Sequence, residues 1–148
     1  MLLKVVGGIA GVAVAVVAFS LISKGCASYL ADEGKTVQAY FRAVGSGDTA
    51  KACGLLADGA VAKLQEQQQA PSCEVAVRSL YTALNQNERD ALVKQDISVN
   101  ESRATTRRKE ITIVSSNPLG LYDFALKDRD GREVIIDWGL DAMQISST

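Results

Sequence analysis

Few residues in this chain are suited to chemistry. It has 148 residues and no histidine, so the commonest general base near neutral pH and the commonest metal ligand are both missing. Asp137 stands beside Trp138 in an apolar run. A carboxylate buried there would have a raised pKa and serve as a base, but alternation along a strand predicts that Asp137 faces solvent. The chain has no phosphate loop, nucleophile elbow or metal-ligand spacing, so we predict no catalytic residue, no metal and no cofactor.

The cysteines carry a clearer signal. Cys53 and Cys73 are the only two outside the N-terminal segment. A bridge between them would close a loop of about twenty residues and stabilise the domain by roughly 3 kcal/mol. Disulfides persist where the compartment is oxidising, so the pair predicts a domain outside the cytoplasm. Two buried free thiols are the alternative.

One basic cluster is present, formed by Arg103, Arg107, Arg108 and Lys109. Alternation places Arg108 on the opposite face from the other three, which favours a solvated strand end or loop. Contact with anionic lipid headgroups or an acidic partner is the alternative. The net charge of −1 and the pI of about 5.5 argue against a nucleic-acid partner.

The aromatic residues either line a cavity between helices and strands or fill the core. Core packing accounts for most of them. Beyond residue 30 the chain has six aromatic residues. One is Phe41, and the other five are our candidates for a pocket: Tyr40, Tyr81, Tyr122, Phe124 and Trp138.

The N-terminal segment predicts a membrane anchor. Residues 5–23 contain no charge and would form a helix of about 28 Å, which matches the hydrocarbon core of a bilayer. Because a cleaved signal peptide usually has a shorter apolar region, of about 7 to 15 residues, we favour a retained span. We expect the N-terminus in the cytoplasm, residues 1–30 as anchor and flank, and residues 31–148 as one extracytoplasmic domain.

Two further features belong to this segment. Gly7, Gly11 and Ala15 recur every four residues, the small-residue spacing that lets membrane helices approach closely, although a lipid-facing stripe without a partner is the favoured interpretation. Processing near Cys26 would release the domain or leave it lipid-tethered, but Lys24 interrupts the small or apolar residues that usually precede such a cysteine.

The elements that position these residues follow from periodicity. The first helix carries Val37, Tyr40, Phe41 and Val44 at helical spacing and is stopped by the glycines at 45 and 47. Asp48 is a predicted N-cap, Asp58-Gly59 a predicted break, and Pro71-Ser72 a predicted start, with one or two further turns in residues 87–94.

From residue 96 onward the period changes to two. Asp130-Gly131 marks a hairpin, and Asn117-Pro118 with Gly120 separates two earlier strands. The predicted fold is α+β, with three or four helices packed on a curved antiparallel sheet of about four strands.

The run YFRAVGSGDTAKACGLLADGAVAKL followed by PSCEVAV resembles exported, membrane-tethered nuclear transport factor 2-like domains of high-GC Gram-positive bacteria. The matching positions are Tyr40, Phe41, Gly47, Asp48, Ala52, Cys53, Leu55, Leu56 and Cys73. The resemblance implies a cone of helices and bent sheet, often with a pocket at its open end. It implies no single activity, because function on such a fold depends on the pocket residues.

Three functions are expected, in this order. The first is a non-enzymatic binding or scaffold domain, an accessory subunit of an envelope or membrane complex. The second is a binder of a small apolar or lipid-like ligand in the cone cavity. The third, an isomerase- or hydrolase-like enzyme, is least favoured because the acid–base dyads of such enzymes have no match here.

Overall fold

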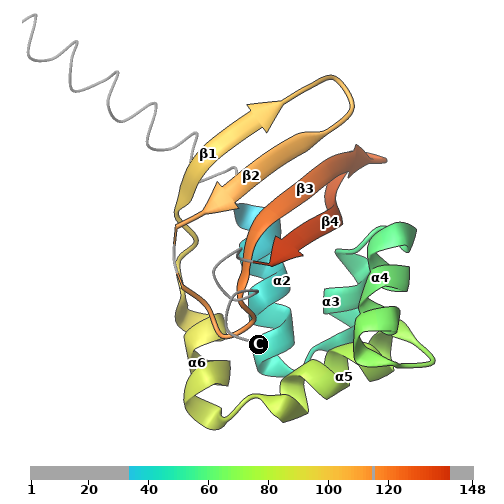
Figure 1. Cartoon of the computed structure of the whole chain (residues 1–148), viewed down its shortest axis with the longest axis vertical. Coiled ribbons are helices and arrows are strands. Elements are labelled where there is room, and N and C mark those ends of the chain that lie inside the picture. The colour runs from blue at the N-terminus through green and yellow to red at the C-terminus, as the bar shows by residue number, and fades with distance from the viewer. Residues whose placement is uncertain (1–33, 115, 141–148) are drawn as a thin grey trace, which may run out of the picture.

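The computed structural model describes residues 34–114 and 116–140, and within them helices precede strands. The fold is α+β, with the helices packed on an antiparallel sheet, as the change of period predicts. Figure 1 shows the helices gathered on one side of the sheet. The helices are α2 (Lys35–Ser46), α3 (Thr49–Gly54), α4 (Asp58–Gln68), α5 (Cys73–Ala83) and α6 (Gln86–Lys94), and the strands are β1 (Val99–Ala104), β2 (Lys109–Ile113), β3 (Leu121–Arg129) and β4 (Arg132–Leu140).

The predicted anchor lies outside the described residues. The same holds for the small-residue stripe of Gly7, Gly11 and Ala15 and for the lipidation candidate Cys26. In the part of the chain that the structure describes, no helix is both long and apolar enough to cross a bilayer.

Local capping explains where the helices begin and end. Gly47 closes α2 with φ 72°, a conformation that glycine adopts without steric cost. Asp48 caps α3 by accepting a hydrogen bond from the backbone N–H of Lys51, as predicted. Asn85 and Glu88 form a capping box that begins α6. The described region therefore has five helices rather than three or four, because α6 is a full helix and not an extra turn.

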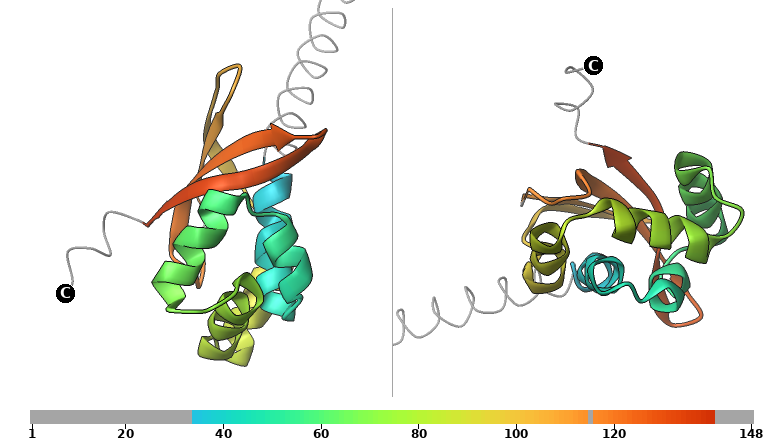
Figure 2. Two further views of the ribbon diagram at one scale, coloured as in Figure 1. Left: turned by 90° about the vertical axis from the view of Figure 1, so that its right-hand side faces the viewer. Right: turned by 90° about the horizontal axis from the view of Figure 1, so that it is seen from below.

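The four strands are hydrogen-bonded in chain order, each antiparallel to the next. The β3–β4 hairpin turns at Asp130 and Gly131, both with positive φ, which confirms the predicted turn. Ile111 and Phe124 point to the helical side and are buried, and Phe124 packs edge-on against Phe41 of α2. The two views in Figure 2 show the described helices against one face of the sheet, and no described helix covers the other face.

The connection from α3 to α4 is tied to the last strand. Leu56 forms a parallel bridge with Ile135, and the flanking backbone groups of Leu55 and Ala57 bond to the backbone of Ile135. The predicted break at Asp58-Gly59 is therefore wrong by a few residues, because this pairing holds residues 55–57 extended and α4 begins at Asp58 itself.

A bulge changes the predicted alternation along β4. Ala125 pairs with Asp137 while Leu126 pairs with Ile135, so Ile136 is an extra residue. As a result Ile135 is fully buried, and Ile136 is only partly buried.

The two cysteines of the domain lie at disulfide distance. Cys53 in α3 and Cys73 at the start of α5 have their Sγ atoms 2.01 Å and their Cα atoms 6.0 Å apart. The pair joins two helices of the layer that covers the sheet, as the sequence predicts.

Candidate functional site

The strongest candidate site is a pocket between the helical layer and the sheet, which we call the inner pocket. Its volume is about 300 Å³. Helices α2, α4 and α5, the β2–β3 loop, and strands β3 and β4 supply its eight lining residues: Tyr40, Leu64, Gln67, Gln68, Leu80, Leu119, Leu121 and Trp138. All eight are uncharged, and half of them are leucines, so the pocket suits a largely apolar molecule.

The β2–β3 loop reaches the pocket because Asn117 folds it tightly. Its side-chain oxygen accepts hydrogen bonds from the backbone N–H groups of Leu119 and Leu121, and its amide donates to the carbonyl of Leu121. Gly120, with φ 64°, completes the turn. Both leucines thereby stand at the pocket wall.

Tyr40 is the deepest polar group of the inner pocket. Its side chain is only 1% exposed, and its hydroxyl makes no hydrogen bond with a described residue. No fully buried polar side-chain atom of the described region lacks a partner, so the Tyr40 hydroxyl keeps a small accessible surface, and Tyr40 itself lines the pocket. Burial raises the pKa of Tyr40 well above its ordinary value of 10.0, which keeps the hydroxyl protonated and able to donate.

Trp138 is held in place from the side of α4. The Nζ of Lys63 lies 2.6 Å from Oδ1 of Asp137 and 2.6 Å from the carbonyl oxygen of Trp138. The same Nζ lies 5.3 Å from the centroid of the indole ring, a cation–π distance. Lys63 therefore fixes the end of β4 to the helical layer.

The structure excludes Asp137 as a buried base. Its side chain is half exposed, and the hydrogen bond from Lys63 lowers the pKa of Asp137 below its ordinary value of 3.8. The carboxylate is thus ionised and already paired. The prediction that Asp137 turns toward solvent is the one that the geometry supports.

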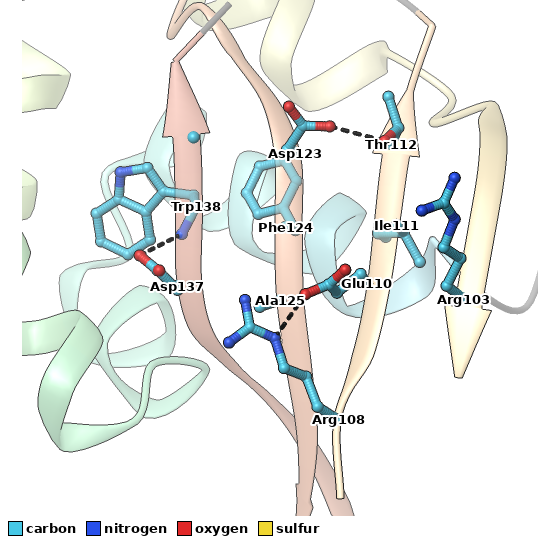
Figure 3. A pocket seen from close by; sticks show the side chains of 11 residues that line it. Arg103, Arg108, Glu110, Ile111, Thr112, Asp123, Phe124, Ala125, Asp137 and Trp138 are labelled. Carbon is cyan, nitrogen blue, oxygen red and sulfur yellow. Dashed lines mark hydrogen bonds and ion pairs between the residues drawn. The ribbon is translucent and has the colours of Figure 1, made fainter. Parts of the chain in front are cut away.

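A second concavity lies on the opposite face of the sheet, and we call it the outer hollow. Its volume is about 360 Å³. Figure 3 looks onto this face, with the helices behind the strands. Three polar pairs mark it: Arg108 with Glu110 at 2.9 Å, Thr112 with Asp123 at 2.7 Å, and Asp137 with Lys63. The lining residues are Arg103, Arg108, Glu110, Ile111, Thr112, Asp123, Phe124, Ala125, Asp137, Trp138 and Gly139.

The basic cluster is divided differently from the prediction. Arg103 and Arg108 line the same hollow, because the turn of residues 105–108 between β1 and β2 resets the alternation. Lys109 instead forms an ion pair with Glu133, and Arg107 lies exposed in the turn.

The structure brings together only some of the predicted pocket residues. Tyr40 and Trp138 line the inner pocket. Phe124 and Trp138 also border the outer hollow, although the Phe124 ring packs toward the helices against Phe41. Tyr81 lies elsewhere, with its ring 4.0 Å from the guanidinium carbon of Arg89. Tyr122 is partly buried against the core and lines neither concavity.

The sequence reasoning missed the four leucines and two glutamines of the inner pocket. The leucines fit helical and strand periodicity and are read as core. Gln67 and Gln68 belong to a polar run with no special spacing. The structure also shows no cluster of metal-ligating side chains among the residues it describes.

Comparison of this chain with protein-family models, with curated proteins and with solved structures found no match.

Proposed function

We propose that the chain is a membrane-anchored extracytoplasmic domain that binds a small, largely apolar ligand in the inner pocket. One observation carries the proposal: an uncharged pocket of about 300 Å³, with leucines as half of its lining residues, lies between the helices and the sheet. Pockets of this size and lining are typical of small-molecule sites.

The subcellular localisation is part of the same proposal. The charge-free stretch of residues 5–23 supports a retained membrane anchor. The placement of Cys53 and Cys73 at disulfide distance supports an oxidising compartment. The finer fold is also proposed, namely a cone of the nuclear transport factor 2-like kind, and a pocket between helices and sheet fits that form.

Binding is favoured over catalysis. Among the eight lining residues only Tyr40 titrates, and burial raises the pKa of its hydroxyl rather than lowering it toward neutrality. General acid–base catalysis works best with a pKa near the operating pH. Asp137 does not supply a second acid–base group, since Lys63 holds it ionised and it lies outside the inner pocket.

The test is native mass spectrometry of the full chain, extracted from its own membrane with a mild detergent. We expect a retained mass beyond that of the polypeptide. Leu80→Trp places a larger side chain in the pocket and should abolish the retained mass. Val75→Trp is the matched control on the same helix, because Val75 is 40% exposed and lies outside the pocket.

Two results would count against ligand binding. One is a wild-type protein that carries no ligand and gains none when lipid extract is added. The other is equal retention of the ligand mass by Leu80→Trp and by wild type. This comparison requires that Leu80→Trp and Val75→Trp keep the wild-type melting temperature to within a few degrees.

A second candidate is docking of another envelope protein on the outer sheet face. The observation that favours it is the outer hollow, a polar concavity that no described helix covers. Asp123→Lys reverses a charge there, and in this candidate it should remove a cross-linked partner that the wild-type full chain captures. If Asp123→Lys leaves that cross-link intact, docking does not use this face.

A further inference from the structure

The inner pocket has no charge with which to meet an ionised ligand. Its eight lining side chains are uncharged, and Leu64, Leu121 and Trp138 are each less than 9% exposed. Moving an ionised group from water into such a lining is costly unless a partner waits for it. The volume equals roughly ten water molecules at about 30 Å³ each, so a ligand of similar size fits.

Lys63, which contacts the Trp138 ring, does not change this balance. Lys63 lies behind the Trp138 ring, but its ammonium group is bound by the Asp137 carboxylate and by the carbonyl of Trp138. A ligand carboxylate would have to compete with that ion pair. Lys63 itself is not part of the pocket lining.

One polar group in the pocket is available to hydrogen-bond a ligand. Tyr40 is only 1% exposed and its hydroxyl makes no hydrogen bond with a described residue, so a ligand that fills the pocket without bonding this hydroxyl would leave it unpaired, which is costly. Buried tyrosine hydroxyls usually find a partner. The other polar side chains of the lining, Gln67 and Gln68, are more exposed and mark the mouth.

On the basis of the proposed function, we propose that the inner pocket selects an uncharged amphiphile whose single polar oxygen enters first and hydrogen-bonds the Tyr40 hydroxyl. The apolar body of the ligand then lies among the leucines and extends toward Gln67. Tyr40 is thus the residue that determines specificity, and an alcohol or carbonyl oxygen is accepted where a carboxylate is not.

The experiment uses the full chain in phospholipid nanodiscs, with empty nanodiscs as the blank. Octanol and octanoate serve as probes, since they share a chain length and differ in charge. Trp138 is the only tryptophan and lines the inner pocket, so its emission reports binding. We expect saturable binding of octanol and at least about tenfold weaker binding of octanoate.

Three variants test the position of the polar oxygen. Tyr40→Phe removes only the hydroxyl and should weaken octanol binding by about fivefold. Tyr81→Phe makes the same change away from the pocket, and Gln67→Leu changes the mouth. Tyr81→Phe should bind octanol as wild type does, and Gln67→Leu should lose less octanol affinity than Tyr40→Phe.

The outcomes separate the inference from the function on which it rests. Equal affinities for the two probes, or an unchanged octanol affinity in Tyr40→Phe, would overturn the inference while leaving a ligand pocket. A loss of affinity in Gln67→Leu without one in Tyr40→Phe would overturn it as well. If wild type binds neither probe and retains no native ligand, the proposed function itself fails.

Discussion

The two faces of the sheet offer a contrast between paired and unpaired polar groups. The outer hollow is lined by charges that already have partners, such as Arg108 with Glu110 and Asp137 with Lys63. The inner pocket is largely apolar but holds one hydroxyl, that of Tyr40, that makes no hydrogen bond with a described residue. A ligand on the outer face would therefore gain little binding free energy from these polar groups, because their hydrogen bonds and ion pairs are already made.

The two concavities also depend on different parts of the fold. The outer hollow is built from the strands alone and the turns between them. The inner pocket needs α2, α4 and α5 to hold their positions over the sheet. Changes in the helical layer should accordingly damage the inner pocket more than the outer hollow.

The largest effect is expected from the cysteine pair. Replacing both Cys53 and Cys73 by alanine removes a cross-link over a sequence separation of 20, and the free energy of unfolding should fall by about 3 kcal/mol. Chemical denaturation of the full chain in detergent measures it. Because the link joins α3 to α5, octanol binding should weaken too. A loss below about 1 kcal/mol would mean that packing alone fixes the helical layer.

The next largest effect is expected at Gly45. A Cβ at Gly45 would lie 2.7 Å from the carbonyl oxygen of Arg89 and 2.9 Å from the Cβ of Leu92, so α2 and α6 would be forced apart. Overpacking costs about 1–3 kcal/mol and the helix propensity of alanine returns up to about 1, so Gly45→Ala should destabilise by about 1.5 kcal/mol.

Gly139→Ala is the matched change at the outer hollow. A Cβ there would lie 3.6 Å from the Cβ of Asp123, an ordinary contact, and stability should stay within about 0.5 kcal/mol of wild type. Thermal unfolding of the two variants compares the layers directly. Equal melting temperatures would contradict the view that the helical layer is the more tightly constrained.

A smaller effect is expected at the paired charges of the outer hollow. Arg108→Gln breaks the contact with Glu110, and both of these side chains are about half exposed. Exposed ion pairs contribute little, so the loss should be about 0.5 kcal/mol or less and should shrink in high salt. A loss above about 2 kcal/mol would show that the hollow carries part of the stability of the fold.

The smallest effect concerns pH. The hydrogen bond from Lys63 lowers the pKa of Asp137 below 3.8, so this carboxylate adds stability above that value and the gain is lost as the pH falls through its lowered pKa. Wild type should exceed Asp137→Asn by a few tenths of a kcal/mol at neutral pH, after allowance for solvent screening. The difference should vanish in acid. A constant difference from pH 7 to pH 2, measured by denaturation, would contradict this assignment.

Much of the fold could be predicted because its signals are local. Capping by Asp48, the stop at Gly47 and the turn at Asp130-Gly131 are encoded within a few residues and are found as predicted. The cysteine pair likewise follows from count and spacing.

The rest required knowledge of distant contacts. Residues 55–57 are held extended by Ile135, and the bulge at Ile136 is fixed by pairing with β3. The inner pocket is assembled from leucines that differ from core leucines only in having space beside them. Tyr40 is a pocket candidate from its residue type, but only the packed structure shows that its hydroxyl has no hydrogen-bond partner among the described residues.

The bridge between Leu56 and Ile135 has a consequence for the order of synthesis. The helices leave the ribosome first, and both cysteines of the domain are available long before β4 is made. The backbone groups of residues 55–57 must wait for Ile135, which lies near the other end of the described chain. Such non-local contacts form late because they close a long loop. A chain interrupted before Ile135 could therefore be oxidised and largely helical, yet it would have no inner pocket.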